Sequence, residues 1–558
     1  MPVLFNDAID DMPVLDRQAV FAQQRSNARA NLLGESECAL LQNVSTGSTG
    51  VCKSRRGFHY VAALPGSGTV QGAAFFDSST EYLVVVRNGI IYVLDSTYAT
   101  VGSSYNNVTS NNGDASNRAS FAQIADRMFV GTGGASETMV EITISGGVPV
   151  FTPSTDTMMA SRLMVAQNFR LFAVSNVDNT TVNNSSIYTS GFLPAAPPVF
   201  GGAVSFDVGQ DYDDITALAA GTDFLLYVFK ERSCYAVGTA PTAATGSGPT
   251  AAADFTIRQL SRDIGCVSAR TVVQIGNDTF FLSRDGVRTL QRTLADGMTA
   301  IQPPISEPIN DVIERINWNY AHTATAVYRD RKYILALPLD GATAPSHVVV
   351  FDTAAGGWSM WTGVLPIDLI NVSFGESKLL VVSATTISEY RDYIKETNLV
   401  ATDHQEKDST GAYTSPTLKL ISRALTFGEP LNPKTQDYIE LEFDRGSNLR
   451  LDVSVILDNS DETLVAANLN TGGGSSVLLP VVLPFVLPKG AITRKRISLL
   501  GSGLTTLSAL DDVNPAREMQ VVITQAAGLT GGEAAQSKVL QIRGMVASAF
   551  VETLEVME

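Results

Sequence analysis

Few residues in this sequence are placed where they could carry out chemistry. The main acidic cluster is Asp211-Tyr212-Asp213-Asp214. Its carboxylates could bind calcium through oxygen ligands, or one of them could belong to the pair of facing carboxylates that a glycosidase requires. A single cluster in front of an apolar strand is more typical of a connecting loop. We therefore expect this cluster to have a structural role.

The other candidate ligands and nucleophiles are histidine and cysteine side chains. The histidines are His59, His322, His347 and His404. The cysteines are Cys38, Cys52, Cys234 and Cys266. No two histidines have a metal-ligand spacing, and the sequence contains no CxxC pair and no HExxH, GxSxG, P-loop or EF-hand signature. We expect no catalytic, cofactor-binding or metal site, no enzymatic activity, and Cys234 and Cys266 as small buried hydrophobic residues.

The elements that would have to position functional residues follow a repeated pattern. In residues 263–290, short apolar strands are joined by Gly-Asn-Asp and Arg-Asp-Gly turns. Related units begin at Gly72, Ala119, Ser161, Asp214, Ala269, Thr323 and Ile367. Their starts are 42 to 55 residues apart, near the period of about 40–50 residues of four-stranded propeller blades. The sequence predicts an all-β protein with an irregular β-propeller of six or seven blades; an irregular stack of hairpins in a sandwich is the alternative.

Turn residues support hairpins within these units. The pairs Asn88-Gly89, Asp285-Gly286 and Asp340-Gly341 combine residues that tolerate the positive φ of type I′ turns. Helical patterns are scarce by comparison. We expect short helices at residues 310–318, where the first asparagine could act as a cap, and at residues 17–24.

Composition narrows the possible partners. The chain has 558 residues, 17% of them charged, and a formal net charge of −17. Nucleic-acid binding relies on clustered Lys and Arg, and the basic clusters at residues 53–56 and 494–496 are expected to be solvated strand ends. An acidic wall could nevertheless let DNA slide past without adhering to it.

Nothing in the sequence predicts a helix that spans a membrane, because no run of about 18 apolar residues occurs. The longest apolar run, from Val477 to Leu487, is interrupted by prolines. It is expected to be a buried extended loop or an edge segment, or else an exposed loop that docks a partner or touches a membrane. The acidic N-terminus lacks the pattern of a signal peptide, so we expect the protein to stay in the cytoplasm at first.

The sequence predicts three parts. Residues 1–69 would form an N-terminal arm and leading strands, residues 70–400 the propeller, and residues 401–558 a smaller β-sandwich-like platform domain. The boundary near residue 401 is placed at a polar, turn-rich linker. Beyond it, strands are expected at Tyr438 to Phe443, where polar and apolar residues alternate, and at residues 449–458, 519–524 and 538–553.

Three strings of residues carry a resemblance to a known family. They are CVSARTVVQIGNDTFFLSRDGVRTL from Cys266, PISEPINDVIERIN from Pro304, and LTFGEPLNPKTQDYIELEF from Leu425. Together with residues 31–57, where an early strand leads into an Arg-Gly turn, they resemble the nozzle proteins of short-tailed bacteriophages, also called tail tubular protein B or tail hub proteins. The resemblance extends over nearly the whole chain.

This resemblance implies a structural part of a virion. Family members form a six-fold ring below the portal and adaptor, carry a propeller and a platform-like β domain, and make a channel for genome ejection. Several members have six blades, whereas seven units are counted here. The implied partners are further copies of the chain, portal-side adaptor proteins, tail fibres or spikes, and viral DNA passing through the lumen without specific binding, with no stable insertion into a membrane.

The expected location is accordingly the virion tail, assembled in the cytoplasm of a host bacterium. The arm at residues 1–31 would clasp a neighbouring subunit. Two other classes remain open: a propeller enzyme that acts on carbohydrates, with paired carboxylates at the mouth of its tunnel, and a glycan-binding adhesin.

Overall fold

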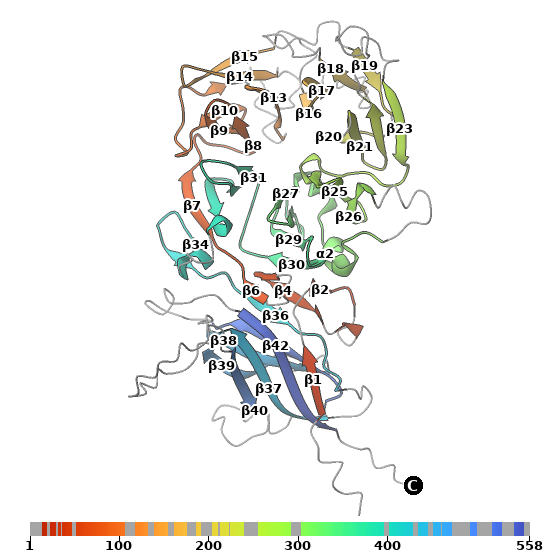
Figure 1. Cartoon of the computed structure of the whole chain (residues 1–558), viewed down its shortest axis with the longest axis vertical. Coiled ribbons are helices and arrows are strands. Elements are labelled where there is room, and N and C mark those ends of the chain that lie inside the picture. Colours follow the sequence, from red (N-terminus) through yellow and green to blue (C-terminus); the bar gives the residue numbers. More distant parts are fainter. Residues whose placement is uncertain are drawn as a thin grey trace, which may run out of the picture.

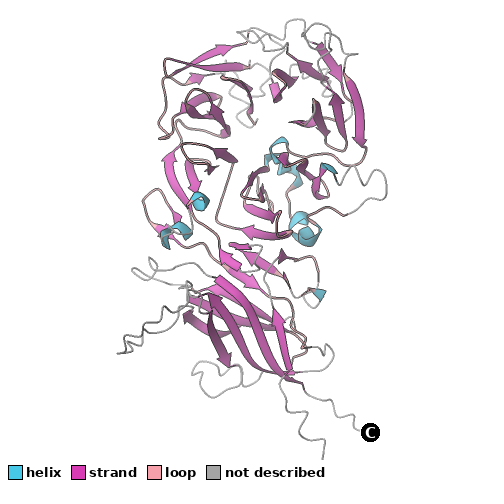
Figure 2. Ribbon diagram, in the orientation of Figure 1, coloured by secondary structure: helices cyan, strands magenta, loops and turns pink. Residues whose placement is uncertain are grey.

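The computed structural model shows a ring of β-sheets joined to a smaller two-sheet unit (Figure 1). Strands make up most of it, and the helices are short (Figure 2). The residues that the structure describes are 14–18, 23–28, 32–34, 36–46, 52–106, 118–131, 139–154, 161–175, 186–190, 204–209, 213–221, 224–238, 255–291, 303–394, 401–427, 434–444, 450–458, 460–470, 492–498, 516–526 and 541–551.

Four blades of the ring each contain four antiparallel strands in chain order. Blade 1 has β8 (Val70–Asp77), β9 (Glu81–Arg87), β10 (Ile90–Leu94) and β11 (Tyr105–Asn106). Blade 2 has β12 (Ser120–Ile124), β13 (Arg127–Gly131), β14 (Val140–Ser145) and β15 (Val148–Pro153). Blade 3 has β16 (Ser161–Gln167), β17 (Arg170–Ser175), β18 (Ser186–Thr189) and β19 (Val204–Asp207). Blade 4 has β20 (Ile215–Ala220), β21 (Leu225–Lys230), β22 (Cys234–Gly238) and β23 (Thr256–Ser261).

Three further blades complete the ring. Blade 5 follows the 3₁₀ helix η4 (Ala269–Thr271) with β24 (Val273–Ile275), β25 (Asp278–Ser283) and β26 (Gly286–Thr289). Blade 6 follows η5 (Glu307–Ile309), α2 (Asn310–Glu314) and η6 (Trp318–Thr323) with β27 (Thr325–Arg329), β28 (Lys332–Leu337), β29 (His347–Asp352) and β30 (Gly357–Trp361). Blade 7 has β31 (Asp368–Val372), β32 (Lys378–Val382), β33 (Thr386–Tyr390) and β7 (Phe58–Ala63).

The ring closes through the first strand of each blade. Strand β8 contacts β12, which contacts β16, and β16 contacts β20. Strand β20 contacts η4, η4 and β24 contact β27, β27 contacts β31, and β31 returns to β8. Within the described residues the structure is therefore a β-propeller of seven sheets, inside the expected range of six or seven.

A separate hydrophobic cluster fills each of the seven interfaces between adjacent blades. Because a blade is covered on both faces, its middle strands are buried on both sides: β9 and β28 have only their first residue less than fully buried. This is why EYLVVVR and KYILAL are continuous apolar runs instead of alternating ones.

Strand β7 joins the beginning of the propeller to its end. It pairs with β33 of blade 7 in antiparallel register, from Phe58 opposite Tyr390 to Ala63 opposite Thr386, although it precedes blade 1 in the chain. Aromatic contacts reinforce the pair, with the Phe58 and Tyr390 ring centroids 4.7 Å apart. An N-terminal strand that completes the last blade holds the ring shut by non-covalent pairing, which makes the closure a long-range contact.

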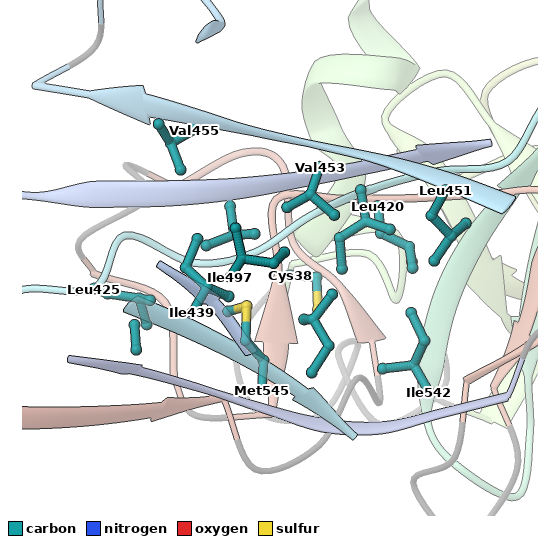
Figure 3. Close-up of a cluster of buried hydrophobic side chains, with 14 of the residues drawn as sticks. Cys38, Leu420, Leu425, Ile439, Leu451, Val453, Val455, Ile497, Ile542 and Met545 are labelled. Atoms are coloured by element: carbon teal, nitrogen blue, oxygen red, sulfur yellow. The ribbon is translucent and has the colours of Figure 1, made fainter. Parts of the chain in front are cut away.

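The second unit is a β-sandwich, as the alternating strands predict. One sheet contains β1 (Val14–Gln18), β5 (Val44–Thr46), β6 (Cys52–Ser54), β37 (Lys434–Asp444), β40 (Ile492–Ser498) and β42 (Gln541–Val551). The facing strands are β4 (Leu40–Gln42), β36 (Lys419–Ile421), β38 (Arg450–Leu457), β39 (Thr463–Asn470) and β41 (Met519–Gln525). Ile439, Leu441 and Phe443 of β37 are fully buried in the core between them, where each contributes about 1.5–3 kcal/mol. Figure 3 shows part of this core, with Ile439 of β37 among its buried side chains.

The two units share one sheet. Strand β30 of blade 6 pairs in parallel with β4, Met360 opposite Gln42, and β4 continues through β36 into the sandwich. Residues 401–417 also lie against the propeller: η9 (Ala401–His404) leads to β34 (Glu406–Lys407), which pairs with β7 and with β35 (Tyr413–Thr414). The polar stretch expected to be a linker is therefore docked on blade 7.

The described parts of residues 1–69 are divided between both units. Strands β4, β5 and β6 belong to the sandwich sheets, and β7 belongs to blade 7. The N-terminal parts pair with their own chain: β1 with β42, and β2 (Gln23–Gln24) with β3 (Glu37–Cys38). The helix expected at residues 17–24 is wrong, because both described ends of that segment are strands.

The expected repeat is confirmed by the strand positions. All seven starting residues lie within two residues of the first strand or 3₁₀ turn of a blade. Asn88 and Gly89, both with positive φ, form the two-residue turn between β9 and β10. The helix near residue 310 is present but shorter than expected, and its cap position is Ile309, with no side-chain cap bond.

Candidate functional site

The centre of the propeller encloses a cavity of about 730 Å³. Residues at or next to the first element of all seven blades line it, at positions 73–75, 118–121, 163–164, 215, 216, 218, 267–270, 322, 325, 326 and 368–371. The volume is within the range of about 300–1,000 Å³ that small-molecule sites occupy. It is too small for a double helix, whose major groove alone is about 12 Å wide.

Arg270 reaches from blade 5 across the cavity to the opposite blades. Its guanidinium pairs with the Asp368 carboxylate on blade 7. Its Nη2 donates to the carbonyl oxygens of Ala119, at 2.7 Å, and Gln71, at 3.3 Å. A Cβ at Gly72 would lie 2.0 Å from Arg270 Nη2, so a larger residue at this position would force the guanidinium to shift.

Asp368 is held by three blades at once. Besides pairing with Arg270, its Oδ2 accepts from the backbone N–H of Ala73 on blade 1 at 2.9 Å. Its Oδ1 accepts from the hydroxyl of Thr325 on blade 6 at 3.2 Å. The carboxylate therefore joins inner elements of three other blades to blade 7.

Arg118 forms a second bridge across the axis. It precedes β12 of blade 2, and its guanidinium donates to the carbonyl oxygens of Ile367 and Thr323, near blades 7 and 6. Burial, followed by repulsion from Arg270, lowers the pKa of Arg118 to about 10. Burial and the Arg118 guanidinium lower the pKa of His322 as well, so this ring is neutral at pH 7.

These contacts tie the ring together at its axis and do not form a hydrolytic pair. A glycosidase uses two carboxylates that face one another across its pocket, about 5–9.5 Å apart. Asp368 is the one carboxylate among the described residues that line the cavity. Within the described part of the chain there is also no group of three His, Cys, Asp or Glu residues able to hold a metal ion.

A second polar centre lies at the joint between propeller and sandwich, around Arg55. Its side chain is completely buried and its Nη2 lies 2.5 Å from Glu406 Oε1. Nε donates to Asn43 Oδ1 at 2.9 Å, and Nη2 donates to the Thr362 carbonyl at 3.2 Å. The guanidinium carbon lies 5.8 Å from the centroid of the Trp361 ring.

The expectation that residues 53–56 are a solvated strand end is wrong at this arginine. Its partners come from three separate parts of the sequence: β4–β5, the end of β30, and β34. A short basic run predicts charge but not the tertiary contacts that can bury it. For the other basic cluster, residues 494–496, the structure gives backbone register only, with Arg494 and Arg496 opposite Glu442 and Glu440.

The residues singled out in the sequence are scattered. Asp213 accepts hydrogen bonds from the Arg232 backbone N–H and from the Ser233 hydroxyl, closing a loop of blade 4; residues 211 and 212 lie outside the described part. Only His322 of the histidines lines the cavity. The four cysteines are buried and none of them forms a disulfide. The apolar run at residues 477–487 also lies outside the described residues.

Arg118, Arg270 and Asp368 were not predicted from the sequence. Each lies within one residue of the start of a repeat unit, at Ala119, Ala269 or Ile367. A charged residue next to the first apolar strand of a blade is the signal that could have found them, because that strand faces the axis. No motif links the three, since they meet only when the ring closes.

Comparisons with known proteins concern the fold. No protein-family model and no curated protein matches the sequence. A chain of the mitotic checkpoint complex is 8% identical, with 60% of this chain and 92% of that chain covered and a TM-score of 0.38. The WD40 β-propeller domain of Doa1 is 9% identical, with 62% and 99% covered and a TM-score of 0.36.

An exo-β-1,3-galactanase from Phanerochaete chrysosporium is also 9% identical, with 77% of this chain and 95% of that chain covered and a TM-score of 0.24. Identities and scores this low give no argument about activity or partners. No described helix is long and apolar enough to cross a membrane. By its fold, this chain is a β-propeller protein with an attached β-sandwich.

Proposed function

We propose that this protein is a structural subunit of a short bacteriophage tail, forming a six-fold homo-oligomeric ring below the portal and adaptor. The observation that carries the proposal is the joint between propeller and sandwich. One sheet runs through both units, and the buried Arg55 fastens β4–β5, β30 and β34 to one another. A propeller and a β platform fixed together are what the resemblance to tail nozzle proteins implies.

The arrangement suits a building block. Arginine bridges cross the propeller axis, and β7 completes the last blade, so the ring resists opening. The described parts of the N-terminal arm pair with their own chain. We therefore expect the contacts to neighbouring subunits on the outer surfaces of the propeller and the sandwich.

The proposed DNA conduit lies between subunits and not within one propeller. The cavity of a single propeller is far too small for a duplex, and two arginines project across it. A lumen between acidic subunits, each with a net charge of −17, would repel phosphates and let the genome pass without adhering. Portal-side adaptor proteins, and tail fibres or spikes, are the proposed partners in a virion assembled in the host cytoplasm.

The assembly state tests the proposal. Mass photometry should show a species of six 59.4 kDa subunits, either alone or after adding the portal and adaptor proteins, and electron microscopy of that species should show a ring. Monomers under all these conditions would refute the proposal. Turnover of glycans by the purified monomer would instead support a carbohydrate-active enzyme, and binding without turnover an adhesin.

The conduit can be tested separately. In assembled particles, replacing lumen carboxylates by lysine should slow DNA ejection, with the largest effect at low salt because screening is weakest there. Ejection at an unchanged rate at low salt would reject the electrostatic mechanism while leaving the ring intact.

A further inference from the structure

The central cavity of the propeller carries an excess of positive charge. The ionisable side chains that face it are Arg118, Arg270, Asp368 and His322. His322 is neutral at pH 7, because burial and Arg118 lower its pKa. Two guanidinium groups therefore share a single carboxylate, inside a protein whose total charge is −17. Buried charges are normally paired, because a desolvated charge without a counterion is unfavourable.

Arg118 has the capacity to bind a further acceptor. A guanidinium has five N–H donors, and two groups of Arg118 donate to backbone carbonyl oxygens, those of Ile367 and Thr323. Neither acceptor is an anion. The carboxylate of Asp368 is already engaged by Arg270, Thr325 and Ala73.

The wall contributed by blades 3 and 4 is mainly apolar. Its partly exposed hydrophobic side chains are Leu163 and Leu218, and the Thr216 hydroxyl there already donates to the Cys266 carbonyl oxygen. The charged groups lie toward the other blades: Arg270 ends at blades 7, 1 and 2, and Arg118 ends near blades 7 and 6. A site with one polar end and one apolar wall matches a ligand with the same division.

We propose that this cavity binds a small organic oxyanion, a carboxylate or a phosphate ester with an apolar body. The oxyanion accepts hydrogen bonds from Arg118, and the apolar body lies against the side chains of blades 3 and 4. Binding would neutralise the excess charge and tighten the inner strands around the axis. The inference rests on the cavity of one chain and is independent of the ring assembly.

Calorimetric titration and thermal unfolding of the full chain test this inference with four probes. Benzoate and phenyl phosphate carry the two oxyanions, benzamide is the neutral analogue of benzoate, and inorganic phosphate lacks the apolar body. Benzoate or phenyl phosphate should bind and raise the unfolding midpoint, whereas benzamide and inorganic phosphate should bind at least about tenfold more weakly. The oxyanion that binds identifies the chemical class.

Two variants locate the site. Arg118→Gln should weaken binding by about tenfold or more. Leu218→Trp should weaken it by filling the apolar side without altering an arginine, and so serves if Arg118→Gln does not fold. Arg315→Gln is the matched control, because Arg315 forms an exposed ion pair with Asp340 outside the cavity; it should bind like the unmodified chain.

Four results would overturn the inference: no binding of either oxyanion, equal binding of benzamide, equal binding of inorganic phosphate, or binding that neither cavity variant weakens.

Discussion

Replacing Arg55 by methionine should destabilise the joint between propeller and sandwich by about 3 kcal/mol. The substitution keeps much of the apolar stem and removes the guanidinium. Removing one partner of a buried ion pair typically costs about 3–5 kcal/mol. The lower end applies because the Glu406 side chain is 26% exposed and can regain water, whereas that of Arg55 is 0% exposed.

Differential scanning calorimetry measures the effect. A change of about 1 kcal/mol moves the unfolding midpoint by roughly 2–4 °C in a domain of 150–250 residues, so a loss of about 3 kcal/mol should lower the midpoint by about 6–12 °C. Because Arg55 joins the propeller to the sandwich, the unfolding transitions of these two units should also separate in the Arg55→Met variant. Arg55→Lys should give an intermediate result, since lysine keeps the charge but not the planar fork.

Arg315→Ala is the control, because its ion pair with Asp340 is exposed on both sides. Surface pairs of this kind contribute about 0–1 kcal/mol. If Arg55→Met and Arg315→Ala lowered the midpoint equally, or if the two units of Arg55→Met still unfolded together at the original temperature, Arg55 would not hold the joint.

Three other predictions follow from buried groups and from ring closure. Burial lowers the pKa of His404 in the folded protein. As pH falls below about 6.5, this histidine is therefore protonated in the unfolded chain before it is protonated in the folded one. Stability should therefore be full above that pH and decline on acidification toward pH 5.5; His404→Gln should flatten the curve of unfolding midpoint against pH, and an unchanged curve would contradict this. Burial raises the pKa of the Cys38 thiol, and that of Cys52 to about 12, so iodoacetamide at pH 8 should label both only in urea; equally fast labelling of the native protein, detected by mass spectrometry, would disprove it. Tyr60→Pro, in the middle of β7, should loosen blade 7 and increase proteolysis of the propeller, and native-like protease resistance would argue against closure by this strand.

The blade pattern was accessible to sequence reasoning because it is local. Hairpins depend on turn residues such as Asn88-Gly89 and on apolar runs a few residues apart, and both are contiguous in the chain. The alternation in Tyr438 to Phe443 likewise predicted a strand with one buried face. The short helix expected at residues 17–24 failed, because pairing of β1 with β42, more than 500 residues away in the chain, outweighs a weak local preference.

The candidate site could not be predicted from local sequence patterns. Arg118, Arg270 and Asp368 belong to three different blades and meet only at the axis. Arg55 illustrates the same limit: a basic run usually indicates solvent exposure, and only partners brought from β30 and β34 make burial of its charge possible. Such contacts depend on ring closure and on the joint between units, which no local pattern encodes.

The sequence alone determined the all-β class, the seven repeated units and the second β-rich part, because strand periodicity and turn chemistry act over a few residues. Tertiary structure decided how the ring is closed, how the leading strands divide between propeller and sandwich, and which charges face the central cavity. Those features arise from pairing and burial between segments hundreds of residues apart. The free energy that stabilises such a contact depends on both segments together, so neither segment alone predicts it.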